Sequence, residues 1–234
     1  MVRRVAHRRP GAAAWDWFTE IERAGGLAAA LDSGLVGDRI AAAWDARTER
    51  LAHRTDAITG VSEFPNLAEK LPARQPAADL RPTGGLPRVR AAQAFEDLRD
   101  RADAAPTRPQ VYLATIGSVA RHTARASFAS NLFQAGGIAT PSGDGTSGLA
   151  DAGTTVACIC GTDRDYADSA AALAAELRAA GATSVWLAGK PSLQVDGVDG
   201  YVYAGCDALD VLQQVHQQLG TSPSPANGTQ EVPA

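Results

Sequence analysis

Uninterrupted apolar runs alternate with amphipathic stretches along the second half of the chain. Each run has the length of a strand, and the stretches between them repeat apolar residues at helical spacing. The predicted strands are 111–116, 138–140, 154–160, 184–188 and 201–204, and the predicted helices are 91–104, 121–135, 167–180 and one that begins after the capping residue Asp207. Strands that are apolar throughout and are joined by helices are typical of a parallel sheet buried on both faces.

Glycines and polar stretches punctuate this pattern. Gly136-Gly137 and Gly181 follow predicted helices, and the Gly/Ser-rich stretch 141–148 is predicted to be a loop. Five strands in a domain of this length favour the flavodoxin-like, doubly wound order 2-1-3-4-5. The domain is expected over 91–220, and the polar, proline-bearing tail 221–234 is expected to be disordered.

The first 90 residues show no alternation of strands and helices. Helices are predicted from Trp15 to the glycines at 25–26, from Leu27 onward, and from Asp38 to Leu51, after a frayed, solvated basic leader. These helices, within 1–59, are too short to bury a core of their own. The segment 60–90 is rich in proline and carries interspersed leucines, which predicts an extended linker laid along a partner surface.

Charge separates the same two parts of the chain. Residues 1–90 carry 14 basic and 11 acidic side chains, whereas 91–234 carry 8 and 15, for a net charge of −4. That balance argues against a dedicated nucleic-acid binder. No apolar run approaches the roughly 18 residues of a membrane span. The four histidines show no metal-ligand spacing, so surface positions are expected for His7, His53 and His216.

The three cysteines are predicted to be buried free thiols in a reducing cytosol. Cys158 and Cys160 lie two residues apart in an apolar strand, so their side chains share one face, and Cys206 follows the last strand. A strained disulfide or half of a metal site is the weaker alternative.

Ligands of doubly wound sheets bind at the carboxyl ends of the strands, so function is sought in the loops there. These loops are 117–122, 161–165, 189–192 and 205–207. They contain no Gly-x-Gly-x-x-Gly or Walker sequence, and no nucleophile elbow surrounds Ser118. A receiver-type acidic pair is also absent from them. The acidic run that starts at Asp163 is interpreted as capping a helix.

Four segments, in this order, resemble the methylmalonyl-CoA mutase family, and most closely its small, non-catalytic subunits. They are 21–31 (IERAGGLAAAL), 58–67 (ITGVSEFPNL), 95–99 (FEDLR) and 120–129 (ARHTARASFA), and the resemblance covers 15–219. It implies that 1–59 is a helical remnant of the end of a coenzyme A-binding TIM barrel. It also implies that 91–220 is a degenerate cobalamin-binding-type domain.

Catalytic members of this family hold adenosylcobalamin through an Asp-x-His-x-x-Gly loop after the first strand, whose histidine ligates cobalt. Aligned from Gly117, the carboxylate position here is Val119 and the ligand position is Arg121, which has no lone pair to donate. His122 stands one residue late and has no Asp two places before it. The remaining vestigial corrin-pocket positions are Gly161, Gly189 and Gly205. Arg121 and Lys190 are candidates to fill the vacant pocket or to pair with Asp163 or Asp165.

The resemblance therefore implies a structural subunit of an isomerase, cytoplasmic and without catalytic residues, metal or cofactor of its own. Adenosylcobalamin is expected in the partner, a large catalytic mutase subunit that forms a heterodimer with this chain. No nucleic-acid or membrane partner is expected. The alternative is an independent small-molecule or corrinoid-binding module that kept the flavodoxin-like fold and changed its ligand.

Overall fold

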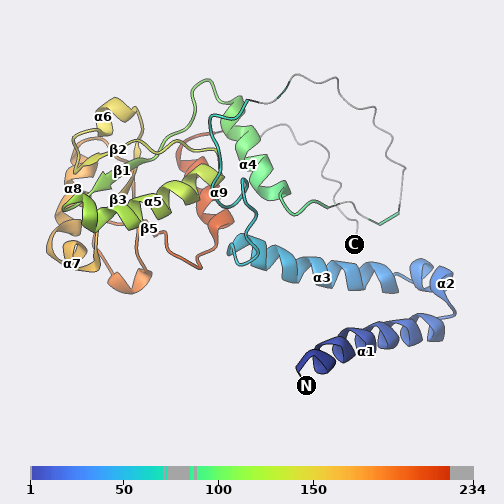
Figure 1. The fold of residues 1–234 in the computed structure, drawn as a ribbon. Coiled ribbons are helices and arrows are strands. Elements are labelled where there is room, and N and C mark those ends of the chain that lie inside the picture. The colour runs from blue at the N-terminus through green and yellow to red at the C-terminus, as the bar shows by residue number, and fades with distance from the viewer. Residues whose placement is uncertain (1, 71, 73–84, 87–88, 222–234) are drawn as a thin grey trace. The chain divides into compact units, whose positions relative to one another are not determined.

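The computed structural model describes residues 2–70, 72, 85–86 and 89–221, with side chains from residue 11 onward. The elements are α1 (Val2–Arg23), α2 (Leu27–Asp32), α3 (Leu35–Ala52), α4 (Gln93–Ala104), β1 (Tyr112–Thr115), α5 (Val119–Ala135), β2 (Ser142–Asp144), α6 (Leu149–Ala152), β3 (Val156–Cys160), α7 (Asp163–Asp165), the π-helix η1 (Tyr166–Ala170), α8 (Ala171–Ala179), β4 (Ser184–Leu187), the 3-10 turn η2 (Pro191–Leu193), β5 (Gly200–Tyr201) and α9 (Ala208–Gln218). They are labelled in Figure 1 where there is room.

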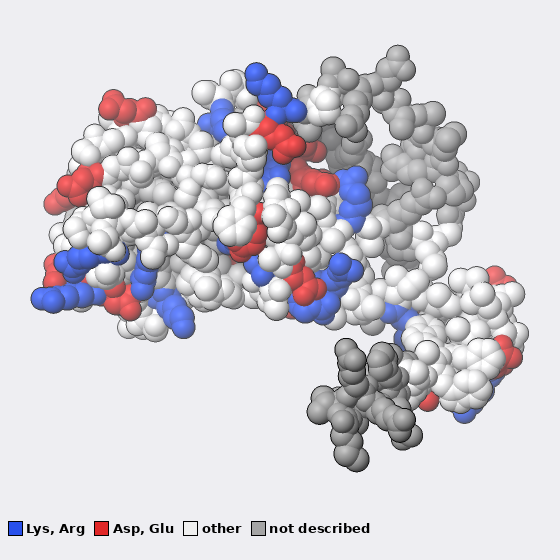
Figure 2. Space-filling model, viewed as in Figure 1, with Lys and Arg blue, Asp and Glu red and all other residues white. Residues whose placement is uncertain are grey.

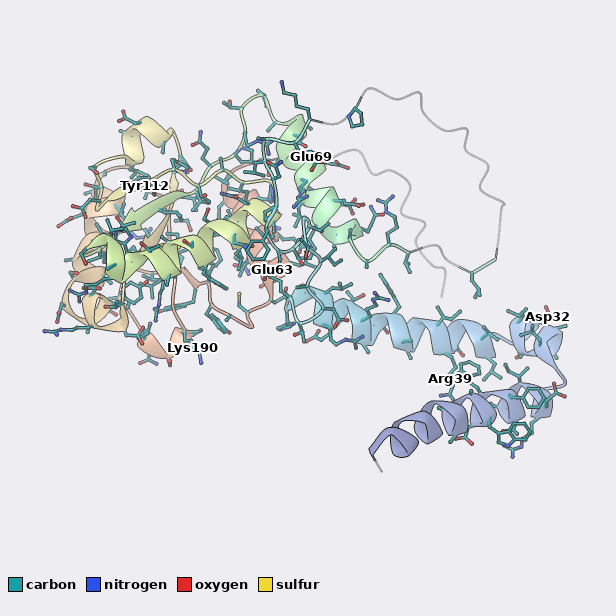
Figure 3. All side chains as sticks on the ribbon, in the orientation of Figure 1. Asp32, Arg39, Glu63, Glu69, Tyr112 and Lys190 are labelled. Carbon is teal, nitrogen blue, oxygen red and sulfur yellow. The ribbon has the colours of Figure 1, made fainter. Side chains whose placement is uncertain are left out.

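The chain divides into two compact units, of which the first comprises residues 1–49 and 81–88. Its described part contains α1, α2 and most of α3. Arg39 on α3 donates to Glu20 on α1 at 2.8 Å and its guanidinium lies 5.5 Å from the Trp17 ring. Figure 3 labels Arg39 between the two helices. Ala30 is the buried apolar residue of this unit, so its described helices enclose almost no core.

The second unit comprises residues 50–80 and 89–234 and contains the sheet. All strand pairs are parallel and the strand order is β2-β1-β3-β4-β5, which confirms the predicted flavodoxin-like order 2-1-3-4-5. Leu113 of β1 lies opposite Cys158 of β3, which in turn lies opposite Trp186 of β4. Figure 1 shows this sheet flanked by helices.

Alternate side chains of each strand enter separate cores on the two faces of the sheet. On one face Leu113 and Cys158 pack with residues of α4, α5 and α9, such as Phe133. On the other, Tyr112 and Ile159 pack with residues of α6, η1 and α8. Helices on both faces explain why every residue of β1, β3 and β4 is buried.

The second strand was predicted in the wrong place. It is Ser142–Asp144, inside the stretch predicted as a Gly/Ser loop, and not 138–140. As an edge strand it is partly exposed, so it needs no apolar sequence. Ile138 is instead buried at the end of α5, and Ala139 makes one isolated bridge to Gln110.

Other boundaries also differ from the predictions. The basic leader is helical from Val2, and the short helix α6 had not been predicted. The predicted last strand 201–204 pairs only over Gly200–Tyr201. The beginning of the predicted linker is folded onto the sheet unit, because Ser62 is fully buried and Arg99 donates to the Val61 carbonyl at 2.7 Å.

The prediction of a surface position for His216 is wrong. The imidazole is 1% exposed and bonds the Gly136 carbonyl at 2.9 Å and Thr221 Oγ1 at 2.7 Å, which ties α9 to the end of α5. Burial lowers the pKa of His216, so the folded chain disfavours the charged ring. His216 therefore favours folding fully above its unfolded pKa, and that contribution falls as the pH drops below it. The His7 side chain lies outside the described residues.

Candidate functional site at the carboxyl ends of the strands

The loop after β1 brings Arg121 to a carboxylate from the loop after β3. Arg121 Nη2 lies 2.5 Å from Asp165 Oδ1, so one of the pairings considered from the sequence is present. Lys190, the other candidate, is exposed after β4, as Figure 3 shows, and makes no ion pair with a carboxylate in the described part of the chain. Arg121, which the family resemblance aligned with the cobalt-ligand position, is therefore held by a salt bridge.

Asp165 is fixed by a capping box at the start of α7. Its Oδ2 accepts from the backbone N–H of Thr162 at 2.9 Å and from the hydroxyl of Thr162 at 2.5 Å. These bonds, and then the charge of Arg121, lower the pKa of Asp165. The carboxylate stabilises the fold above its unfolded pKa, and the contribution is lost as the pH falls through the folded pKa. This confirms the interpretation of the acidic run as a helix cap.

A second arginine, which the sequence had not singled out, crosses the strand ends. Arg125 Nη2 donates to Asp163 at 2.5 Å, and its Nη1 donates to the Ala188 carbonyl at the end of β4 at 2.9 Å. Its guanidinium lies 5.2 Å from the centroid of the Tyr166 ring. Arg125 thereby joins α5 to the loops after β3 and β4. Figure 2 shows basic and acidic side chains intermixed on the side of the molecule where Figure 1 labels α7.

The Tyr166 hydroxyl is the buried centre of this network. It accepts from the Gly161 N–H and donates to the Ala188 carbonyl, both at 2.8 Å, and its residue is 2% exposed. Burial raises the pKa of Tyr166, so the phenol stays protonated and serves as a donor. Tyr166 begins the π-helix η1, a distortion that had not been predicted within the helix 167–180.

Side chains of the chain itself occupy the space beside three of the four glycines expected at these loops. A Cβ at Gly189 would lie 2.7 Å from Leu193 Cδ1 and 2.9 Å from Arg125 Nη1. A Cβ at Gly161 would lie 3.2 Å from Tyr166, and one at Gly117 would lie 3.4 Å from Asp165. A Cβ at Gly205 would meet no described atom of the chain within 4 Å.

His122 is also poorly placed to ligate a metal. It is half-buried near the start of α5, and its Nδ1 is covered by protein and has no hydrogen-bond partner in the described residues. No group of three His, Cys, Asp or Glu residues with metal-site geometry occurs in the described part of the chain. The residues at these strand ends do not fit a corrin held against backbone glycines and a histidine.

The cysteines play no part in this network. Cys158, Cys160 and Cys206 are free and buried, which confirms the prediction of buried thiols. Burial raises the pKa of the Cys158 and Cys206 thiols, so both stay neutral. Within the described residues, no helix is both long and apolar enough to cross a membrane.

The order and parallel pairing of the strands define a doubly wound, flavodoxin-like α/β domain. The family model for methylmalonyl-CoA mutase matches residues 10–134. The chain is 50% identical over 222 residues to a methylmalonyl-CoA mutase small subunit of Streptomyces virginiae, which covers 90% of this chain and 35% of that relative. It belongs to the methylmalonyl-CoA mutase family, as its sequence segments indicate.

Two further relatives carry similar names. A probable methylmalonyl-CoA mutase small subunit of Mycobacterium tuberculosis is 37% identical over 88% of this chain and 34% of its own length. The methylmalonyl-CoA mutase small subunit of Propionibacterium freudenreichii subsp. shermanii is 32% identical over 90% of this chain and 35% of its own. The chain thus spans about a third of the length of the curated relatives it matches.

Proposed function

We propose that this chain is a structural, non-catalytic part of a methylmalonyl-CoA mutase small subunit. In this proposal its sheet domain binds no cobalamin, and its role is to pair with and stabilise a large catalytic subunit. The large subunit would hold adenosylcobalamin and interconvert methylmalonyl-CoA and succinyl-CoA. The names of the relatives support the assignment to the small subunit.

The observation that carries the proposal is the filled pocket. At the position of the family's cobalt-ligating histidine stands Arg121, which has no lone pair to donate and is paired with Asp165. Leu193 and Arg125 occupy the space beside Gly189. In this proposal the salt bridges and packed side chains join the strand ends, and no cofactor is needed there.

Titration of the purified chain with adenosylcobalamin tests the cofactor part of the proposal. We expect an unchanged visible spectrum and no corrin in the protein peak on gel filtration, because the pocket is occupied by side chains. A cobalamin-binding catalytic subunit serves as the positive control in the same buffer. A base-off spectrum on the protein would favour the alternative of a corrinoid-binding module. A histidine-ligated spectrum would assign a ligand role to His122.

The first unit supports the structural part of the proposal. Trp15, Phe18, Leu27 and Leu31 are 64%, 51%, 58% and 46% exposed, and Trp15 and Phe18 stack at 5.4 Å. Large exposed apolar side chains on helices that enclose almost no core are typical of a surface that another fold covers. We propose that the helices of the first unit, up to residue 49, pack against the remainder of the small subunit, the barrel that the family resemblance implies.

Replacing both Trp15 and Phe18 by serine is expected to weaken this association at least about ten-fold, because buried aromatic residues dominate interfaces. The measurement is co-purification of the chain with separately tagged barrel and large-subunit chains. Val119→Ser is the matched control, since Val119 is 72% exposed but lies on the sheet unit. Unchanged recovery of the double variant would contradict the proposed packing.

A further inference from the structure

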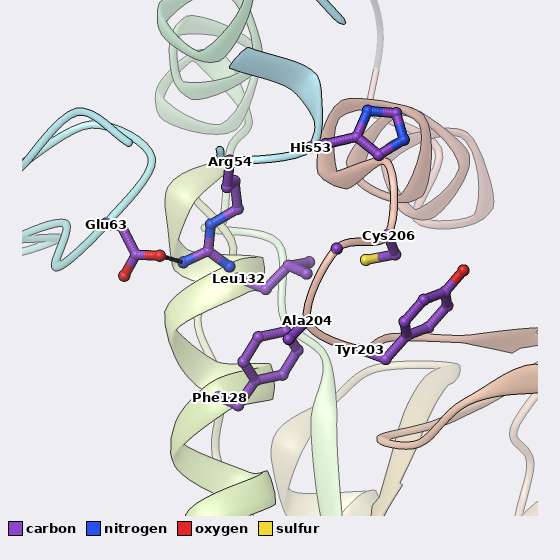
Figure 4. A pocket seen from close by; sticks show the side chains of 9 residues that line it. His53, Arg54, Glu63, Phe128, Leu132, Tyr203, Ala204 and Cys206 are labelled. Carbon is purple, nitrogen blue, oxygen red and sulfur yellow. Dashed lines mark hydrogen bonds and ion pairs between the residues drawn. The ribbon is translucent and has the colours of Figure 1, made fainter. Parts of the chain in front are cut away.

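A partly open cavity of about 130 Å³ lies in the second unit, apart from the network at Arg121 and Arg125. Figure 4 shows its walls, which combine α5, the loop after β5 and the residues that follow α3. Phe128 and Leu132 form an apolar wall, and Arg54 and Cys206 stand across from each other. Gly205, the glycine that faces open space, belongs to this lining.

Arg54 reaches the cavity from an unusual backbone position. It ends α3 with a φ of 56°, and the N–H groups of Arg54 and Thr55 bond the carbonyls of Leu51 and Arg50 at 3.0 and 2.8 Å. This is the helix-ending motif in which glycine is preferred at the left-handed position. An arginine there turns its long side chain inward, so that the side chain is only 9% exposed.

The guanidinium of Arg54 has more donors than the protein uses. Nη2 donates to Glu63 at 2.6 Å and to Asn131 at 2.9 Å, while the buried Nε has no partner among the residues that the structure describes. The ring of Phe128 lies 5.8 Å from the guanidinium carbon. A buried donor without a partner costs about 1–3 kcal/mol, so a small turn of the guanidinium that brings this edge to an acceptor in the cavity is favoured. Glu63 does not pair the Arg54 Nε, because among the nitrogens of Arg54 its carboxylate bonds Nη2. The Glu63 side chain is 29% exposed.

We propose that this cavity binds a small monocarboxylate, with its oxygens on the free donors of Arg54 and its hydrocarbon part against Phe128 and Leu132. Planar carboxylates match the geometry of a guanidinium edge. A phosphate dianion fits less well, because it would set two charges against a cation already shared with Glu63 and would offer nothing to the apolar wall.

The volume limits the size of the ligand. A cavity of about 150 Å³ accommodates benzene, so about 130 Å³ suits a chain of roughly six non-hydrogen atoms. Butyrate has this size, and butyramide has the same shape without the charge. The neutral thiol of Cys206 on the opposite wall adds no charge that would repel the carboxylate.

The experiment is a titration of the full chain with butyrate, followed by NMR shifts of the Leu132 methyl groups and by alkylation of Cys206 with iodoacetamide. We expect saturable shifts, and Cys206 alkylation about six-fold slower at a butyrate concentration five times the dissociation constant. Cys158 and Cys160 are fully buried in β3, so they should stay unalkylated and serve as the internal reference that the chain remains folded. Sodium chloride at equal ionic strength controls for salt. Absence of saturable shifts would overturn the proposal.

Three comparisons isolate the carboxylate and the cavity. Butyramide is expected to bind at least about ten-fold more weakly, because it lacks the charge that strengthens hydrogen bonds to arginine. Arg54→Met removes the donors and should abolish the preference for butyrate. Cys206→Leu fills the cavity without touching Arg54, and should abolish the Leu132 shifts in a chain with unchanged circular dichroism. Equal binding of both probes, or undiminished binding by the folded Cys206→Leu chain, would refute the assignment.

Discussion

Replacing Gly137 by alanine is expected to lower the free energy of unfolding by about 3 kcal/mol. Gly137 follows α5 with a φ of +81°, a left-handed conformation that disfavours any side chain. Its added Cβ would also lie 2.7 Å from Ala102 Cβ and 3.2 Å from the Arg99 backbone, both on α4. Because a helix backbone cannot rotate away as a side-chain tip can, α4 would have to shift. Urea denaturation of the two chains measures the difference.

Gly153→Ala is the control that separates backbone strain from crowding. Gly153 has a φ of +60°, but a Cβ there would meet no atom within 4 Å. Its replacement is expected to cost about 1 kcal/mol, the conformational part alone. Equal losses for the two variants would contradict the close approach of α4 to the end of α5.

The parts of the fold that could be predicted from sequence are those where one physical effect dominates. Strands β1, β3 and β4 are buried on both faces, so their sequences are mostly apolar, and their alternation with helices predicted a parallel sheet. The edge strand Ser142–Asp144 could not be found in this way. Its pairing is set by the edge of β1 that β3 leaves unpaired, and hydrogen bonds between backbones do not depend on which side chains the strand carries.

Some features of the candidate site could also be predicted from sequence, and others could not. The loops, and the substitution of Arg121 for a ligand, could be located from sequence because they follow strand ends and a motif. The pairing of Arg121 with Asp165 was one of several pairings considered, because the sequence does not give the distances between loops. The roles of Arg125 and Leu193 could not be predicted, because an arginine within a helix and a leucine shortly after a proline are common in sequences without such a role. The buried position of His216 was missed for a related reason, since its partner Gly136 is 80 residues away in sequence.

Tyr166 offers the sharpest test of whether this network substitutes for a bound ligand in joining the strand ends. Tyr166→Phe keeps the ring that packs beside Arg125 but removes the hydroxyl that bonds Gly161 and Ala188. The Ala188 carbonyl retains Arg125, whereas the buried Gly161 N–H loses its partner. We expect the free energy of unfolding to fall by about 2 kcal/mol, the cost of one lost hydrogen bond and one unsatisfied buried donor.

The position of the loss distinguishes this role from general destabilisation. If the hydroxyl holds the loops after β3 and β4 together, amide hydrogen exchange at Gly161 should accelerate more than exchange in the centre of β3. Tyr201→Phe is the matched control, because that hydroxyl accepts a single bond from the Val195 N–H at 3.1 Å and its residue is only half-buried. It should cost less than about 1 kcal/mol and leave Gly161 exchange unchanged. Uniform acceleration in Tyr166→Phe would mean that the hydroxyl supports the whole domain and has no special role at the strand ends.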